Sequence, residues 1–159
     1  MEGLRPTPDR VRETLFNWLG QTLYGKRCLD LFAGSGALGF EAASRNAAEV
    51  VMVENNRAAF RALQENSKKL SCVNIALHCE DGIEFTRRGS GLYDVIFLDP
   101  PFQSDLLAKA LPLLGNRLAE DGLVYVETGA AFEPDAAWEV VKRAKAGQVF
   151  YQLLRQARK

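Results

Sequence analysis

The sequence predicts an α/β fold: a mostly parallel, seven-stranded sheet with helices on both faces, ending in an antiparallel hairpin. Short runs rich in β-branched and aromatic residues alternate with helical patterns along most of the 159 residues, which is typical of parallel strands joined by helical crossovers. A glycine-rich turn follows the first of these runs, where a strand would meet a helix. The last two runs are separated by a turn that is too short for a helical crossover, so they predict a hairpin.

Composition limits the classes of protein that this chain can form. With 47% hydrophobic residues, residues 1–159 are expected to build one core and a single domain. Twenty basic and twenty acidic residues give a formal net charge of zero, so a nucleic acid would have to bind a local patch. Three cysteines and one histidine lack a zinc-binding spacing, and we expect buried, reduced thiols and no metal. No apolar run approaches the roughly 20 residues of a membrane span, and a cytoplasmic protein is expected.

The first expected element is a helix within residues 1–20 that packs on the sheet. Thr7 is expected as its N-cap, with Pro8 at the first helical position and Asp9 after it. Apolar residues then recur at helical spacing. They are Val11, Leu15, Trp18 and Leu19.

Five strands follow, with helices in the four gaps between them. The strands are expected at Cys28–Phe32, Val50–Glu54, Asn74–Cys79, Asp94–Leu98 and Leu123–Glu127. The apolar face of the helix in the second gap is expected to comprise Phe60, Leu63, Ser67 and Leu70. Residues Thr128–Ala137 resemble a loop. The hairpin strands are expected at Glu139–Lys145 and Val149–Leu154, on either side of a turn that contains Gly147.

The glycine turn and a later carboxylate have the spacing of a nucleoside-binding βαβ unit. Residues Gly34–Gly39 spell GxGxxG between a strand and a helix, and Glu54 lies twenty residues after Gly34. The glycines would let the backbone approach a ligand, and Glu54 would accept hydrogen bonds from both ribose hydroxyls. NAD-dependent dehydrogenases use the same pattern to bind pyrophosphate at a helix N-terminus, so an NAD-binding oxidoreductase is an alternative.

Asp30 favours a cationic ligand over a dinucleotide. It lies four residues before Gly34, where a carboxylate would repel pyrophosphate and attract the ammonium group of S-adenosylmethionine. Asp81 is expected to accept from the adenine amine beside the small Gly82, with Glu80 as a second choice and a helix N-cap as the alternative role of Asp81. The alternative is that Asp30 only caps the end of a strand and binds no ligand.

Asp99-Pro100-Pro101-Phe102 follows the fourth apolar strand and predicts a pocket for a planar amine. Adjacent prolines fix the backbone φ and have no N–H, so their carbonyls can accept hydrogen bonds from a ligand. We expect Asp99 and Pro100 to accept the amine N–H groups and Phe102 to stack on the base. These three are the expected catalytic residues.

The chain resembles the RsmD family of 16S rRNA guanine-N2 methyltransferases. The resemblance lies in Asp30–Gly39, Asp99–Phe102 and, most specifically, the N-terminal segment Leu4–Leu19. It implies a class I, Rossmann-like methyltransferase fold with strand order 3-2-1-4-5-7-6 and S-adenosylmethionine as donor. The implied acceptor is the exocyclic N2 of a guanine in 16S rRNA or the assembled small ribosomal subunit. The sequence leaves the oligomeric state open, and a monomer is the default expectation. Residues expected to bind the donor are Thr7, Asp30, Phe32, Gly34, Ser35, Gly36, Glu54, Asn55, Asp81, Gly82 and Asp99.

The motifs leave the acceptor base open. The Asp-Pro-Pro-Phe motif reports an amine and is compatible with N6-adenine or N4-cytosine methylation, and a non-catalytic RNA-binding module is a further alternative. Arg5, Arg10 and Arg12 are expected to contact RNA phosphates or to close over the donor; the alternative is a solvated helix face with an Arg–Glu13 pair. Family members usually carry a basic segment ahead of the N-terminal motif, which this sequence nearly starts on, so RNA binding is expected to be weaker than donor binding.

Overall fold

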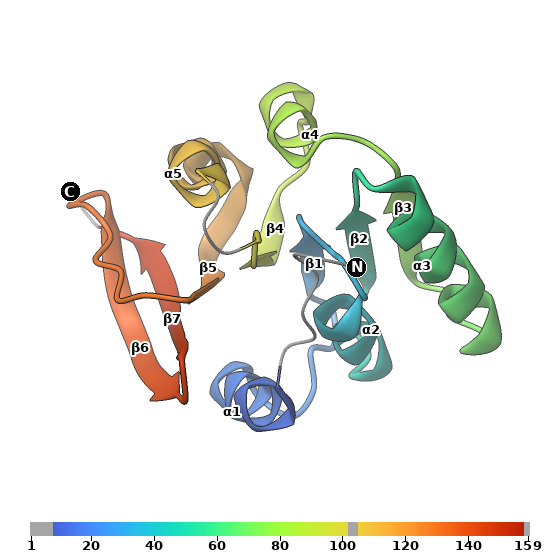
Figure 1. The fold of residues 1–159 in the computed structure, drawn as a ribbon, viewed down its shortest axis with the longest axis horizontal. Coiled ribbons are helices and arrows are strands. Elements are labelled where there is room, and N and C mark those ends of the chain that lie inside the picture. Colours follow the sequence, from blue (N-terminus) through green and yellow to red (C-terminus); the bar gives the residue numbers. More distant parts are fainter. Residues whose placement is uncertain (1–7, 102–104, 158–159) are drawn as a thin grey trace.

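One seven-stranded sheet organises the computed structural model, which describes residues 8–101 and 105–157. Its strand order is β3-β2-β1-β4-β5-β7-β6 (Figure 1), as the family resemblance implies. Strands β1 to β5 pair in parallel and β7 is antiparallel to both of its neighbours. The strands are β1 Arg27–Asp30, β2 Glu49–Val53, β3 Ile75–His78, β4 Tyr93–Leu98, β5 Leu118–Thr128, β6 Trp138–Ala146 and β7 Val149–Gln156.

Helices cover both faces of the sheet (Figure 1). They are α1 Asp9–Leu19, α2 Ala37–Ser44, α3 Arg57–Lys69, α4 Gly82–Arg88 and α5 Leu106–Ala110, which continues into the 3-10 helix η1 Leu111–Arg117. Phe16 of α1, Leu38 of α2 and Leu63 of α3 are buried in the core on one face. Ile83 of α4 and Leu114 of η1 are buried in the core on the other. The central strands β1 and β4 are therefore covered on both faces of the sheet, as parallel sheets require.

Helix α1 begins one residue later than expected. Pro8 occupies the N-cap position with an extended backbone, φ −55° and ψ 143°, so the helix starts at Asp9; the expected cap, Thr7, lies outside the described residues. Val11 and Leu15 are buried as expected. The ring of Trp18 stacks on Tyr151 of β7 with centroids 5.2 Å apart, which docks α1 on the sheet near the hairpin.

Three local features differ from the sequence expectation. Leu70 was expected on the apolar face of α3, but it follows the last helical residue and is 61% exposed. The fourth crossover is only briefly α-helical, because Pro112 lies near the start of η1 and interrupts α-helical hydrogen bonding. Strand β5 begins at Leu118, five residues early, and its pairing with β4 shifts register between Tyr93 and Val95.

The C-terminal hairpin forms as predicted. Strands β6 and β7 pair antiparallel around Gly147, whose φ of +60° suits a residue without a side chain. The expected loop occupies residues 129–137. Cys28 is buried, but Cys79 is exposed, which corrects the expectation that the thiols are buried.

Two findings concern other classes of site within the described residues. No helix there combines the length and apolar character that crossing a bilayer requires. Residues 8–101 and 105–157 also contain no group of three or more His, Cys, Asp or Glu side chains that could hold a metal ion.

Candidate active site

A cavity of about 320 Å³ lies where β1, β2 and β4 end. Ligands of open α/β sheets bind at this carboxyl edge of the strands, and the volume is within the range of small-molecule sites. The cavity brings together most of the residues expected from sequence. Those that line it are Asp30, Phe32, Gly34, Ser35, Glu54, Asn55, Asp81, Gly82, Asp99 and Pro100.

Asp30 is a buried carboxylate in the cavity wall, only 2% exposed. Its Oδ2 accepts a hydrogen bond from the backbone N–H of Gly39 at 3.1 Å. Burial raises the pKa of Asp30 to about 7; the Gly39 bond lowers it, and the charge of Glu54 raises it. A carboxyl group in this state gains most from a cationic partner, because a positive charge beside it restores the ionised form.

Glu54 connects the glycine turn to the start of α3. Its Oε1 accepts from the N–H of Gly34 and its Oε2 from the N–H of Asn56, both at 2.8 Å. These two bonds fix the plane of the carboxylate at the cavity wall. Since each carboxylate oxygen has two lone pairs, the group retains capacity for a pair of ligand hydroxyls.

The glycine turn approaches the cavity through Gly34 and Ser35. Gly36 was expected there as well but does not line the cavity. It is the N-cap of α2 with φ +84°, and an added Cβ would lie 2.5 Å from the ring of Phe40. Gly36 therefore makes the turn possible rather than facing the cavity.

Asp81 and Gly82 form another part of the wall, at the start of α4. Asp81 caps this helix, because its Oδ2 accepts from the N–H of Glu84 at 2.9 Å; the capping role named as an alternative is present. At Gly82 an added Cβ would lie 2.9 Å from the ring of Phe32. Glu80, the second choice for an adenine contact, forms an ion pair with Arg88, and its Oε2 lies 3.6 Å from Nδ1 of His78.

Asp99, Pro100 and Pro101 line the side of the cavity that follows β4. Pro100 is buried and Pro101 is exposed, so the turn leads from the core to the surface. Phe102 lies outside the described residues, and its stacking role stays a prediction. The structure thus places Asp30 and Glu54, the carboxylates expected to bind a nucleoside, in the same cavity as the turn expected to hold an amine.

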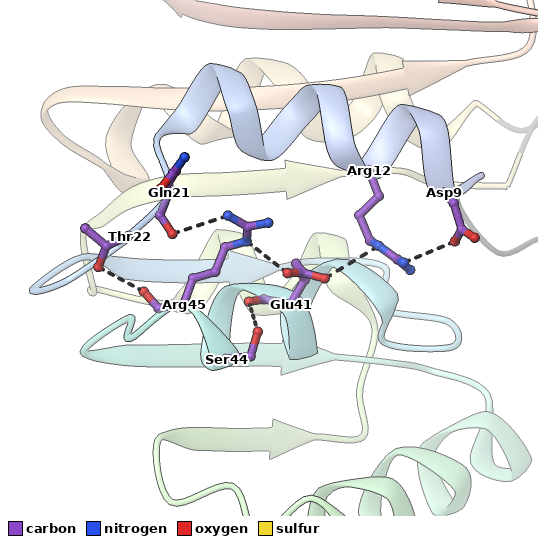
Figure 2. Close-up of polar contacts among 7 residues, drawn as sticks. All are labelled: Asp9, Arg12, Gln21, Thr22, Glu41, Ser44 and Arg45. Carbon is purple, nitrogen blue, oxygen red and sulfur yellow. Dashed lines mark hydrogen bonds and ion pairs between the residues drawn. The ribbon is translucent and has the colours of Figure 1, made fainter.

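Arg12 belongs to a network that joins α1 to α2 (Figure 2). Its guanidinium forms ion pairs with Asp9 at 3.1 Å and with Glu41 of α2 at 3.6 Å, and Arg45 binds the other oxygen of Glu41 at 2.9 Å. These partners differ from the Arg–Glu13 pair named as an alternative. Arg10 is exposed, whereas Arg5 lies outside the described residues.

Sequence reasoning did not single out several other lining residues. They are Leu31, Ala33, Ala37, Leu38, Asn56 and Leu106. Ala37 and Leu38 occupy variable positions of the glycine motif, and Asn56 follows Glu54 closely, so proximity to those motifs was the available signal. Leu106 comes from α5, and no local pattern indicates that this helix reaches the cavity.

Comparisons with known proteins agree on one family for this chain. The profile of the family described as Conserved hypothetical protein 95 matches residues 1–155. The chain is 42% identical over 157 residues to Ribosomal RNA small subunit methyltransferase D of Escherichia coli, an alignment that covers 95% of this chain and 79% of that protein. It is 35% identical over 149 residues to Putative rRNA methyltransferase YlbH of Bacillus subtilis, covering 89% and 80%.

Solved structures resemble the fold over nearly its whole length. Putative methyltransferase yhhF from Escherichia coli superposes with a TM-score of 0.89 at 40% identity, covering 99% of this chain and 90% of that one. A ribosomal protein L11 methylase from Lactobacillus delbrueckii has a TM-score of 0.76 at 18% identity, covering 94% and 79%. The architecture is therefore the class I methyltransferase fold.

Proposed function

Because the chain belongs to the RsmD family, described as Conserved hypothetical protein 95, we propose that it methylates small-subunit rRNA. The reaction is transfer of a methyl group from S-adenosylmethionine to the exocyclic N2 of a guanine in 16S rRNA. The observation that carries this function is that Asp30, Glu54, Asp99 and Pro100 all line the same cavity. One part suits the donor and the other suits an amine acceptor.

The residues in the cavity fit S-adenosylmethionine. Asp30 would bind the ammonium group, Glu54 the two ribose hydroxyls, and Asp81 with Gly82 the adenine; Phe32, Ser35 and Asn55 would complete the wall. The bound donor supplies a methyl group made electrophilic by its sulfonium. The buried carboxylate of Asp30 argues against NAD, because it would face a pyrophosphate in the usual placement of that motif.

Asp99 and Pro100 provide the acceptor chemistry in this proposal. A guanine amine is a weak nucleophile because its lone pair is delocalised into the ring. The Asp99 carboxylate and the Pro100 carbonyl would each accept one amine N–H and direct the lone pair at the methyl carbon. These bonds strengthen as the nitrogen becomes positively charged, so they stabilise the transition state more than the ground state. Asp99 would then take the proton that the methylated nitrogen loses.

The acceptor must reach this turn as an unstacked base. Enzymes that modify a base in structured nucleic acid remove it from its stack, and the proposed partner is 16S rRNA or the assembled small subunit. Arg10, which is exposed, and Arg5 are proposed to contact RNA phosphates, whereas Arg12 holds α1 against α2. Phe102 is proposed to stack on the base and Thr7 to contact the donor. The enzyme is proposed to be a monomer with a single domain and to act in the cytoplasm.

Two measurements on one sample test this function. Calorimetric titrations with S-adenosylhomocysteine and with NAD are expected to show that the protein binds S-adenosylhomocysteine and does not bind NAD. Radiolabel from S-adenosylmethionine is then expected in 16S rRNA of undermethylated small subunits, and digestion to nucleosides is expected to release N2-methylguanosine. Label on adenine or cytosine would redirect the function to those bases. Binding of NAD alone would refute the methyltransferase.

A further inference from the structure

Helix α3 concentrates positive charge in a chain whose formal net charge is zero. It contains Arg57, Arg61, Lys68 and Lys69 against a single carboxylate, Glu65, and all five residues are exposed. The helix lies beside β3, at one end of the sheet (Figure 1). A local cluster of one charge sign on an otherwise neutral protein creates a field that attracts the opposite charge.

Three of these cations form a stripe along the solvent side of the helix. With about 100° of rotation per residue, Arg57, Arg61 and Lys68 project within about 40° of one another. Ala59 and Leu63 are buried and project from the other side of the helix. The rise of about 1.5 Å per residue separates Arg57 from Arg61 by about 6 Å along the axis, and Arg61 from Lys68 by about 10 Å. These three residues are called the α3 stripe.

The α3 stripe has no partner within the part of the chain that the structure describes. None of its side chains forms an ion pair or a hydrogen bond with residues 8–101 or 105–157. Other arginines there pair with carboxylates, as Arg12 does with Glu41 and Arg27 with Glu49. Arg57 is also the first residue of α3, where the helix dipole disfavours a positive charge. Neither ion pairing nor helix stability therefore explains these charges, and an anionic partner would.

The α3 stripe begins at the cavity. Asn56 lines the cavity and is the N-cap of α3, because its Oδ1 accepts from the N–H of Ala59 at 2.9 Å. The backbone N–H of Asn56 donates to Oε2 of Glu54 at 2.8 Å, which fixes the first turn of α3 to the cavity wall. Arg57 follows directly, so the stripe leads away from the cavity along the helix.

Arg10, already proposed to contact RNA, lies at the same edge of the sheet. Helices α1 and α2 run in the same direction, because Arg12 contacts Glu41 and the ring of Phe16 lies 4.9 Å from the guanidinium carbon of Arg45. The first turns of α1, α2 and α3 therefore all lie at the carboxyl edge, and α2 lies between the other two (Figure 1). Arg10 and the α3 stripe are on opposite sides of the glycine turn that begins α2.

We propose that the α3 stripe binds the phosphate backbone of the rRNA whose target base enters the cavity. The inference rests on the proposed function and deepens it, since it adds a second contact surface to Arg10. An RNA that delivers a base to Asp99 and Pro100 covers the mouth of the cavity and reaches the start of α3. Contacts to phosphates fix the position of a nucleic acid without reading its sequence. A local patch of this kind is also what a protein without net charge needs to bind RNA.

The test removes two charges from the α3 stripe and, in a matched control, two charges elsewhere. The stripe variant is Arg61→Gln with Lys68→Gln, and the control is Lys26→Gln with Lys142→Gln. Lys26 and Lys142 are exposed and have no ion pair within residues 8–101 and 105–157. Lys26 precedes β1 at the amino edge, and Lys142 belongs to β6 at the other end of the sheet. Both variants change the net charge equally.

Binding to undermethylated small subunits is measured against salt concentration with S-adenosylhomocysteine present. Each lost phosphate contact lowers the slope of log affinity against log salt by about 0.7 to 0.9. The stripe variant is therefore expected to lower the slope by about 1.5 and the affinity at 0.1 M salt by about 30-fold. The control is expected to change the slope by less than about 0.5. Titration with S-adenosylhomocysteine checks that the stripe variant is folded.

The outcomes separate this inference from the proposed function. A stripe variant with the wild-type slope would overturn the inference, and so would an equal loss of slope in the control, which would reveal an effect of net charge alone. If the wild-type protein transfers no label to 16S rRNA, the proposed function is refuted instead, whatever the variants do.

A variant that gains affinity keeps the test decisive if the stripe variant fails to fold. Glu65 is the only carboxylate of α3, and it would repel a phosphate bound to the stripe. Glu65→Gln is expected to bind small subunits at least about 2-fold more tightly than wild type at 0.1 M salt. Glu120→Gln is the matched control, because Glu120 is exposed at the start of β5. A Glu65→Gln protein that binds no more tightly than this control would contradict the assignment of α3 to RNA.

Discussion

Replacing Asp30 by asparagine is expected to stabilise the ligand-free protein above pH 7 and to weaken donor binding. The side chain is buried and accepts one bond from the Gly39 N–H. The asparagine Oδ1 can accept the same bond, so the substitution removes the charge and puts an NH2 group in place of the second carboxylate oxygen. Asparagine is nearly the same size, and no cavity is expected.

The pKa of Asp30 sets the size and the sign of the effect. Burial raises it from 3.8 to about 7, a difference of about 3 units that corresponds to at most about 4 kcal/mol. Between these two pH values the native state holds a proton that the unfolded state has lost. The free energy of unfolding therefore falls as the pH rises from 3.8 to about 7 and is lowered by the full amount above pH 7. The asparagine variant lacks this pH-dependent loss of stability, because asparagine does not titrate.

Urea unfolding of both proteins at about pH 5 and pH 8 measures the effect. The variant is expected to gain stability relative to wild type as the pH rises, because the other titrating groups are common to both proteins and cancel. Calorimetry at pH 6 in buffers of different ionisation enthalpy is expected to show that S-adenosylhomocysteine releases a proton from wild type and none from the variant. At pH 8 the variant is expected to bind it at least about 10-fold more weakly. Parallel stability profiles from pH 5 to pH 8 would refute the assignment of a raised pKa to Asp30.

Three other substitutions test separate parts of the site. Asp99→Asn is expected to lower the single-turnover rate of methyl transfer by about 100-fold or more; an unchanged rate would remove Asp99 from the mechanism. Gly82→Ala would place a Cβ 2.9 Å from the ring of Phe32 and 3.1 Å from a backbone carbonyl, and calorimetry is expected to show at least about 10-fold weaker S-adenosylhomocysteine binding. Glu41→Gln is expected to cost about 1 kcal/mol in urea unfolding, because two arginines share this half-buried carboxylate. The control Glu84→Gln, in a pair that is more than half exposed, is expected to cost less than about 0.5 kcal/mol; equal costs would contradict the role of Glu41.

Sequence patterns predicted the elements because each pattern is local. Local spacings located the seven strands and the first helix within two residues at each end, except that β5 begins five residues earlier than expected. Asp30 and Glu54 were expected together because the carboxyl ends of adjacent parallel strands meet at one edge. The order of the strands came from the family resemblance, since no local spacing specifies which strands are neighbours.

The features that escaped prediction depend on tertiary placement. The partners of Arg12 include Glu41, which is far away in the sequence and comes close only when α1 packs beside α2. Leu70 fits the helical period but falls just beyond the helix end, where the chain turns away from the core.

The position of β7 has a consequence for how the protein acquires its structure. This strand is inserted between β5 and β6, although it follows both in the sequence. Its residues contribute to both cores, with Tyr151 on one face and Leu154 on the other. During synthesis, β5 cannot pair with its second neighbour until β7 has left the ribosome. The same holds for β6, which lies next to β7 at the end of the sheet. Closure of the sheet is therefore a late event, and the nascent chain waits with an open strand edge until then.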